Sequence, residues 1–314
     1  MDAFEKKSVA PMLIGLSAGA FDSGDFIFEL KLDGERCLAY LEQGNCELRN
    51  KRNDRLLPRF PELAGIAAQT RGRCILDGEL IVAVSGRPNF AEVQRRSLLS
   101  NAFKIELAAE KHPASFVAYD ILYLDGRELF AVPLMERKAL LFETVRRETA
   151  LLALSRHVDG AGVRLFEQAA AQGLEGVVAK RRDSLYRPGR RTKDWVKIKN
   201  MQDDDFVVCG RLRKAGGVAS LALGQYRDGT LVYKGHVTMG VSGPDYARIQ
   251  AQPAADCPFA AVPEGNGNAV WLRPELVCVV QFMERTAGGG MRQPVFKGLR
   301  QDKTPQECVE AKIF

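Results

Sequence analysis

The sequence has little of what metal centres, disulfide frameworks and membrane segments require. It contains three histidines in 314 residues, and its seven cysteines are scattered, with no CxxC pair. The sequence therefore lacks the ligands for a zinc site and the cysteine pairs for a disulfide-stabilised fold. A reduced cytosolic location is expected. No apolar run approaches the roughly 18 residues of a membrane helix, and the N-terminal residues lack the basic and apolar segments of a signal peptide. Membrane and secreted classes do not fit.

Internal repeats and low-complexity tracts are also absent, and the remaining composition is globular. Hydrophobic residues make up 46% of the chain and charged residues 27%, which excludes wholesale disorder. At roughly 100–200 residues per domain, the length predicts two domains, each large enough to bury its own core.

Charge is modest overall but concentrated in one place. The net charge of +6 permits a polyanionic partner without indicating one. Residues 180–199, however, hold nine lysines and arginines against two aspartates, a net +7. A solvated basic loop is one interpretation. The interleaved Tyr186 and Trp195, together with the alternation of WVKIK, favour an ordered strand that faces phosphates.

Two regions of different texture follow one another along the chain. In the first, hairpin-like strand pairs separated by helices are typical of an α+β fold. Beyond residue 199, short β-rich runs with Gly and Asp turns predict a small barrel or sandwich of about 110 residues. We therefore expect one domain over residues 1–202 and a second over residues 203–314. The predicted strands are 26–32, 37–41, 75–84, 115–123, 206–212, 220–226, 230–237 and 276–282, and the predicted helices are 133–147 and 163–172.

The segment FIFELKLDGERCLAYLE, residues 26–42, contains the first candidate for chemistry. It reads most simply as two strands joined by a tight turn at Asp33 and Gly34. A hairpin does not explain Lys31, which stands at the turn end of an apolar strand with Asp33 on the same face. A partly desolvated lysine beside other cations can attack as the neutral amine. On this segment alone, a structural hairpin and a nucleophile beside a carboxylate both stay open.

Six further motifs follow this one in the rest of the chain. The seven are ELKLDGER (29–36), KRN (51–53), LDGEL (76–80), FVAYDILYLDG (116–126), EGVVAK (175–180), DWVKIK (194–199) and RQPVFKGLRQDK (292–303). In this order they resemble the motifs of the covalent nucleotidyltransferase superfamily, and within it those of ATP-dependent DNA ligases. The strings YRPGRR and FKGLRxDK resemble in particular the ligase domain of bacterial non-homologous end-joining DNA ligases.

The resemblance implies a fold and a reaction. The fold would be α+β, with a nucleotidyltransferase (adenylation) domain of antiparallel sheets and flanking helices followed by a C-terminal OB-fold β-barrel. Lys31 would attack the α-phosphate of ATP to give a lysyl-adenylate, AMP would pass to a DNA 5′-phosphate, and a 3′-hydroxyl would displace it. Phosphoryl transfers need alignment and charge neutralisation, so a hard oxygen-ligated ion, Mg²⁺ or Mn²⁺, is the expected metal.

The resemblance also assigns roles to single residues. Glu29 would accept a hydrogen bond from the adenine amino group. Tyr119 would stack on the base, although a tyrosine in an apolar strand can equally be a core aromatic. Glu175 could merely open a turn, and Arg49 competes with Arg52 for the role of motif arginine. The implied ATP site is Glu29, Lys31, Leu32, Arg36, Arg52, Glu79, Tyr119, Lys180, Lys197 and Lys199, with Asp33, Glu79 and Glu175 as metal ligands.

The last motif lies in the region that resembles an OB-fold. There it would orient the triphosphate over the active site and swing away once DNA is bound, and the polar segment NMQDDD, residues 200–205, would suit the hinge. An exposed polar tail is the alternative. The implied triphosphate-orienting residues are Arg292, Arg300 and Lys303, with Asp302 in the same motif, and the candidates for DNA backbone contacts are Arg187, Arg190, Arg191 and Lys193.

Other functions compete with DNA ligation. An RNA ligase or an mRNA-capping guanylyltransferase would share the lysine chemistry, the second with GTP. A non-catalytic OB-fold module would explain the basic stretch but not the lysine and carboxylates together. A NAD⁺-dependent ligase fits poorly, because thirty residues ahead of Lys31 leave no room for a nicotinamide-recognising domain.

The expected partner is DNA, as nicked duplex or ends. We expect the two domains to grip it alone or with the help of partners, for which a Ku-type end-binding protein is the candidate that the resemblance suggests. We also expect the protein to be a monomer that is located in a bacterial-type cytoplasm and acts at the nucleoid.

Overall fold

The chain forms two compact units in a computed structural model, which describes residues 2–213, 219–286 and 288–310. The first unit ends at Asn200 and the second begins at Met201, two residues ahead of the expected boundary. No helix in these described ranges is long and apolar enough to cross a membrane.

The first sheet of the first unit has five strands and joins the two ends of that unit. Its one parallel pair is β1 with β12, where Leu13 is registered with Arg191. The other pairs are antiparallel. In order across the sheet, the strands are β1 (Leu13–Ser17), β12 (Arg191–Lys199), β11 (Gly176–Arg181), β2 (Phe26–Leu30) and β10 (His157–Asp159).

The second sheet carries the main core of this unit. Leu76, Leu80 and Phe116 are fully buried on one face of it, at the alternate positions that a half-buried strand predicts. Its strands are β4 (Asn45–Asn50), β3 (Glu35–Glu42), β5 (Cys74–Val84), β7 (Ala114–Leu124) and β8 (Arg127–Glu128), with β6 (Arg87–Pro88) on β5 and β9 (Leu152–Leu154) on β7.

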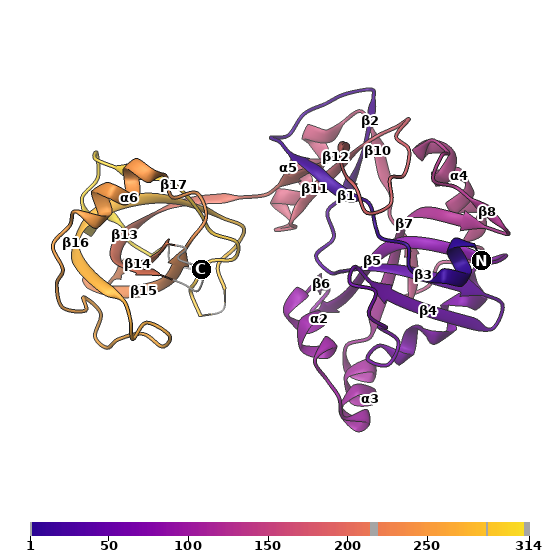
Figure 1. The fold of residues 1–314 in the computed structure, drawn as a ribbon, viewed down its shortest axis with the longest axis horizontal. Coiled ribbons are helices and arrows are strands. Elements are labelled where there is room, and N and C mark those ends of the chain that lie inside the picture. The colour runs from indigo at the N-terminus through magenta and orange to yellow at the C-terminus, as the bar shows by residue number, and fades with distance from the viewer. Residues whose placement is uncertain (1, 214–218, 287, 311–314) are drawn as a thin grey trace. The chain divides into compact units, whose positions relative to one another are not determined.

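Helices cover the outer faces of the two sheets (Figure 1). Helix α4 packs on β7, α5 on β11 and α2 on β5. Asparagine side chains cap two of them, since Asn89 accepts from the backbone of α2 and Asn101 from that of α3. The helices of this unit are α1 (Ala3–Lys6), α2 (Phe90–Ser97), α3 (Ala102–Lys111), α4 (Leu134–Thr144) and α5 (Gly162–Ala171), with the 3₁₀ helix η1 (Pro61–Gln69).

The hairpin expected at residues 26–42 is wrong. Strand β2 belongs to the first sheet and β3 to the second, so Asp33 and Gly34 lie in a crossover between sheets. Lys31 follows the last residue of β2. Its backbone N–H continues the pairing with β11 by donating a hydrogen bond of 2.9 Å to the Gly176 carbonyl. Both sheets contribute buried side chains to one shared cluster, among them Tyr119 and Trp195.

The second unit is a five-stranded barrel with a helix between its third and fourth strands, as an OB-fold requires. A bridge between Met239 and Val295 links the end of one edge strand to the start of the other. The expected α+β fold of antiparallel sheets followed by an OB barrel is confirmed. In sheet order, its strands are β15 (Thr230–Val237), β14 (Ala219–Arg227), β13 (Gln202–Arg213), β16 (Val270–Phe282) and β17 (Val295–Arg300), with α6 (Gly243–Gln250) and the 3₁₀ helix η3 (Pro305–Glu307).

The hinge expected over residues 200–205 is too long. Strand β13 begins at Gln202, and its acidic residues Asp203 to Asp205 pair with β16. Only Asn200 and Met201 lie between strands β12 and β13.

Candidate active site

Strand alternation in the first sheet sorts its side chains onto two faces. Phe28, Ala179 and Val196 point into the apolar core under α5. The intervening residues of β2, β11 and β12, including Glu29 and Lys180, therefore point to the opposite face. This opposite face is the floor of the candidate site.

The register of the three strands places the predicted lysines in two rows. Val178 is paired with Glu29 on one side and with Lys197 on the other, which forms the first row. Gly176 is paired with Lys199 and bonded to the Lys31 backbone, which forms the second. The rows lie two residues apart along the strands, and neighbouring strands are about 5 Å apart, so Glu29, Lys31, Lys197 and Lys199 come to one surface.

Gly176 cannot be replaced in this second row. Its φ of +133° disfavours other residues, and an added Cβ would lie 2.1 Å from the Ile198 carbonyl oxygen. The backbone of the neighbouring Glu175 is also held in place, because the Asn200 N–H donates a hydrogen bond of 2.9 Å to the Glu175 carbonyl. The turn that Glu175 opens is therefore part of the site.

The second sheet supplies the opposite wall. Arg36 on β3 donates two hydrogen bonds of 2.5 Å to the fully buried Asp77 on β5, and its guanidinium lies 4.9 Å from the centre of the Tyr119 ring. Burial lowers the pKa of Arg36, but Asp77 outweighs burial and holds that pKa well above its usual range. A cavity of about 190 Å³ remains between the walls, lined by Ile14, Glu29, Leu30, Lys31, Leu32, Arg36, Glu79, Tyr119, Val178, Lys180 and Trp195.

One end of the cavity gathers a lysine and carboxylates. The Lys31 Nζ lies 2.9 Å from Glu175 Oε1, and the Lys31 side chain keeps 22% of its surface exposed. Burial raises the pKa of Glu79 to about 7; Arg36 and Lys31 lower it, while Asp77 and Glu175 raise it. This end therefore pairs an accessible amine with an excess of negative charge.

At the other end of the cavity, a buried carboxylate and an aromatic ring both contact the same lysine. Glu29, 2% exposed, accepts a hydrogen bond of 3.1 Å from Lys180. The Lys180 Nζ also lies 4.2 Å from the centre of the Tyr119 ring and 4.5 Å from that of Trp195. Burial lowers the pKa of Lys180, and its value settles at about 8 in spite of Glu29. A buried acceptor, a donor and a ring edge are the groups that recognise a nitrogenous base.

The two units match two successive family descriptions. Residues 13–199 match the ATP dependent DNA ligase domain, and residues 214–303 match the ATP dependent DNA ligase C terminal region. The chain belongs to the ATP-dependent DNA ligase family. This membership confirms the resemblance that the seven motifs indicated.

Individual relatives of the family agree with this assignment. The chain is 34% identical over 320 residues to the multifunctional non-homologous end joining protein LigD of Mycobacterium bovis, a match that covers 98% of this chain and 40% of the relative. It is 32% identical over 330 residues to DNA ligase C of Mycobacterium tuberculosis, covering 92% and 89%. A solved structure described as mycobacterial DNA ligase D complexed with ATP and MES matches 97% of this chain and 99% of its own, with 31% identity and a TM-score of 0.57. The chain thus spans less than half the length of LigD.

A metal ion fits part of the predicted ligand set. No three His, Cys, Asp or Glu side chains are grouped to hold a metal ion anywhere in the described ranges, so Asp33, Glu79 and Glu175 do not form a preassembled trio. Glu175 is nonetheless near enough to Glu79 for its charge to raise the pKa of Glu79. Mg²⁺ is commonly held by one or two carboxylates plus phosphate oxygens, and these two residues meet that requirement.

The motif arginine lies outside the cavity. Arg49 is committed to Glu47 and to the Asn53 carbonyl. Arg52 is exposed, and its side chain makes no hydrogen bond or ion pair with any described residue. It lines a larger hollow of about 700 Å³, together with Arg36 and residues of α2. Of the two arginines, Arg52 is the one that lines this hollow.

The remaining predicted residues fall into two groups. Arg187, Arg190, Arg191 and Lys193 are all exposed. In the second unit, Arg300 and Lys303 both contact Asp205, and Arg300 also pairs with Asp302. Arg292 donates to Glu284 at 2.9 Å.

Sequence reasoning missed the roles of two residues, Trp195 in the lining of the cavity and Asp77, which holds Arg36 in its wall. Asp77 stands within the LDGEL motif, two residues before Glu79 and so on the same face of β5, and this spacing was the available signal. Trp195 was noted only for its place in the basic stretch, and its contact with Lys180 needed the pairing of β11 with β12.

Glu79→Gln should make stability less sensitive to pH. A carboxyl whose folded pKa lies above its unfolded value costs stability once it ionises, so this cost is absent below about pH 4.5 and complete above pH 7. Urea unfolding at pH 5 and pH 8 should show wild type losing on the order of 2 kcal/mol more than the variant. Glu106→Gln, at an exposed position of α3, is the matched control. Equal losses in wild type and Glu79→Gln would contradict the raised pKa.

Proposed function

We propose that this chain joins DNA ends with ATP as co-substrate, through AMP bound covalently to Lys31. The observation that carries the proposal is a single cavity with Lys31 and Glu175 at one end and Glu29 and Tyr119 at the other. Membership of the ATP-dependent DNA ligase family supports it. The LigD relatives bear the words non-homologous end joining in their names, which supports a role in DNA repair.

The first step forms a phosphoramidate. The neutral Lys31 amine attacks the α-phosphorus of ATP, a P–N bond forms, and the bond to the β-phosphate oxygen breaks to release pyrophosphate. Glu175 Oε1, 2.9 Å from Nζ, is placed to take the amine proton. Lys197 and Lys199, in the two rows beside Lys31, would neutralise the charge that develops on the α-phosphate.

The following steps transfer AMP. A DNA 5′-phosphate oxygen attacks the same phosphorus and restores the free lysine, and a 3′-hydroxyl then attacks the DNA 5′-phosphorus and releases AMP. Exposed Arg187, Arg190, Arg191 and Lys193 would contact the DNA backbone, and Arg52 the strand near the reacting ends. Arg292, Arg300 and Lys303 would orient the triphosphate in the first step.

A divalent ion, Mg²⁺ or Mn²⁺, would be held by Glu79 and Glu175 with phosphate oxygens. It would supply charge neutralisation to the phosphoryl groups. Burial is the main cause of the raised pKa of Glu79, with Asp77 and Glu175 adding to it, and a bound cation would favour the ionised carboxylate.

The wider setting is part of the same proposal. We place the chain in a bacterial-type cytoplasm as a monomer that works on nicked duplex or ends, with a Ku-type end-binding protein as partner.

Labelling the chain with nucleotide tests the proposal. With [α-³²P]ATP and Mg²⁺, we expect a protein–AMP adduct that is stable to base and labile to acid, as a phosphoramidate is. [α-³²P]GTP and adenylate-labelled NAD⁺ should give no adduct, and a nicked duplex should be sealed with ATP alone. Labelling by GTP would favour a capping-type enzyme, and sealing of nicked RNA but not DNA an RNA ligase. Unlabelled protein that still binds nucleic acid would leave a non-catalytic binding module.

A further inference from the structure

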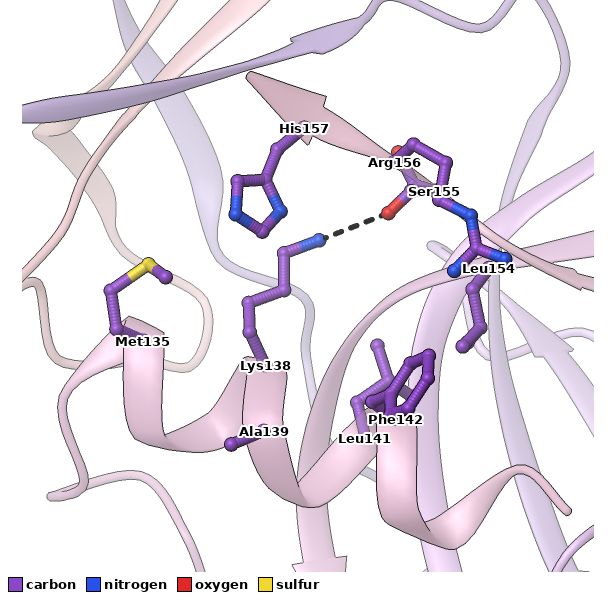
Figure 2. Close-up of a pocket in the computed structure, with 9 residues that line it drawn as sticks. All are labelled: Met135, Lys138, Ala139, Leu141, Phe142, Leu154, Ser155, Arg156 and His157. Atoms are coloured by element: carbon purple, nitrogen blue, oxygen red, sulfur yellow. Dashed lines mark hydrogen bonds between the residues drawn. The ribbon is translucent and has the colours of Figure 1, made fainter. Parts of the chain in front are cut away.

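Lys138 belongs to none of the seven motifs, yet it reaches the base end of the cavity. It lies on α4 and is only 7% exposed, although a lysine is almost never buried without a partner. Figure 2 shows its side chain rising from α4 between the His157 ring and the Ser155 carbonyl, to which its Nζ donates at 3.5 Å. Its main partner is Glu29 Oε1, 2.5 Å away.

The two oxygens of Glu29 have different surroundings. Oε2 accepts hydrogen bonds from Ser155 Oγ at 2.8 Å and from Lys180 at 3.1 Å. Oε1 lies 2.5 Å from the Lys138 Nζ, and a hydrogen bond from Lys138 is among the influences that lower the pKa of Glu29. Because each carboxylate oxygen has two lone pairs, Glu29, which lines the cavity, keeps acceptor capacity for a donor on a ligand.

We propose that Lys138 is a positioning residue for base selection, whose charge holds the Glu29 carboxylate ionised and in place, so that it accepts a hydrogen bond from an exocyclic amino group. This role rests on the proposed function. Adenine presents such a donor at its 6-position. Guanine presents a carbonyl oxygen there, which an ionised carboxylate repels, so the same device rejects GTP.

The charges around Glu29 support this role. Burial raises the pKa of Glu29, but Lys138 and then Lys180 outweigh burial and hold the pKa below its usual range. Lys180 is a weaker support, because its pKa is lowered to about 8 by burial and by Lys138, against the opposite effects of Glu29 and Asp120. Lys138 is therefore the main cation on which the Glu29 carboxylate depends.

A cavity beside Lys138 allows the role of its charge to be tested by substitution. It has a volume of about 380 Å³ and is lined along α4 by Met135, Lys138, Ala139 and Phe142, and on the other side by residues 154–157. Lys138→Met keeps the apolar stem and removes the charge, Lys138→Arg keeps the charge, and Lys138→Ala leaves room for a small amine.

The test separates base recognition from the later chemistry. In Lys138→Met, the KM for ATP in adenylation should rise about 10–100-fold, the size of effect seen when a residue that orients a direct ligand contact is removed. The preference for ATP over GTP should fall by a similar factor. Sealing of a pre-adenylated nick should keep its rate, because that step needs no base selection from free nucleotide. Lys138→Arg should restore most of the preference, and ethylammonium should partly restore it in Lys138→Ala, with equal NaCl ineffective.

The controls keep this proposal distinct from the previous one. Lys104→Met, at an exposed position of α3, should behave as wild type. Wild type without an adduct would refute the proposed function, whereas wild-type adduct with unchanged KM and unchanged ATP preference in Lys138→Met would refute only the role of Lys138. If Lys138→Met does not fold, Lys138→Gln, which keeps a donor and loses the charge, is measured in its place against the same two outcomes.

Discussion

Lys31→Ala should abolish the protein–AMP adduct and reduce ATP-dependent nick sealing by more than about 10³-fold. The reason is that the nucleophile itself is lost, the amine that lies 2.9 Å from Glu175 Oε1 at this end of the cavity. Adduct formation is measured with labelled ATP, and sealing with a nicked duplex that carries a labelled 5′-phosphate.

Two companion measurements make this result specific to Lys31. Sealing of a duplex that already carries AMP on its 5′-phosphate should survive the substitution, because that step forms no bond to lysine. Salt-dependent DNA binding should also survive, since the exposed residues Arg187, Arg190 and Lys193 are unchanged. An adduct in Lys31→Ala would remove Lys31 from the mechanism.

Asp120→Ala should be the most destabilising of the substitutions considered for this chain, by about 3–5 kcal/mol in the free energy of unfolding. Asp120 and Arg137 are both fully buried and joined by two hydrogen bonds of 2.8 Å. Arg137 would keep its bonds to the carbonyls of Val132 and Ser184, but its charge would be left buried and unpaired. Urea unfolding with an unchanged m-value measures the loss.

An exposed ion pair provides the comparison. Asp183 pairs with Arg181 at 2.8 Å, and the two side chains keep 70% and 45% of their surfaces exposed. Asp183→Ala should therefore change the free energy of unfolding by no more than about 0.5 kcal/mol. If Asp120→Ala cost as little, water would have to reach Arg137 in the native state, contrary to its burial.

The motifs named several residues that the structure gathers around one cavity, but the predicted architecture around them was partly wrong. The residues of ELKLDGER were identified, but their strands were expected to form a hairpin. An Asp-Gly turn between two apolar runs has that meaning locally. The true pairing of β2 with β11 and of β3 with β5 joins residues far apart in the chain, and no short-range pattern specifies it.

Residues outside the motifs were hidden for a similar reason. Lys138 lies in a helix whose sequence shows a mixture of polar and apolar residues, like many others. Its meaning depends on Glu29, 109 positions earlier, and only the packed structure brings the two together. The predicted hinge was too long because a run of acidic residues is typical of a loop. In the structure, Asp203 to Asp205 form a strand because they pair with β16.

The parallel pairing of β1 with β12 has a consequence for how the chain is made. Leu13 cannot find Arg191 until 178 further residues have been synthesised, and Ile14 and Trp195 line the same nucleotide cavity. At about 5–20 residues per second, a ribosome needs roughly ten seconds or more to deliver the second partner. During that interval the nascent first strand has no neighbour in its sheet. ATP binding therefore cannot assist the earliest folding events, and becomes available only as the adenylation unit is completed.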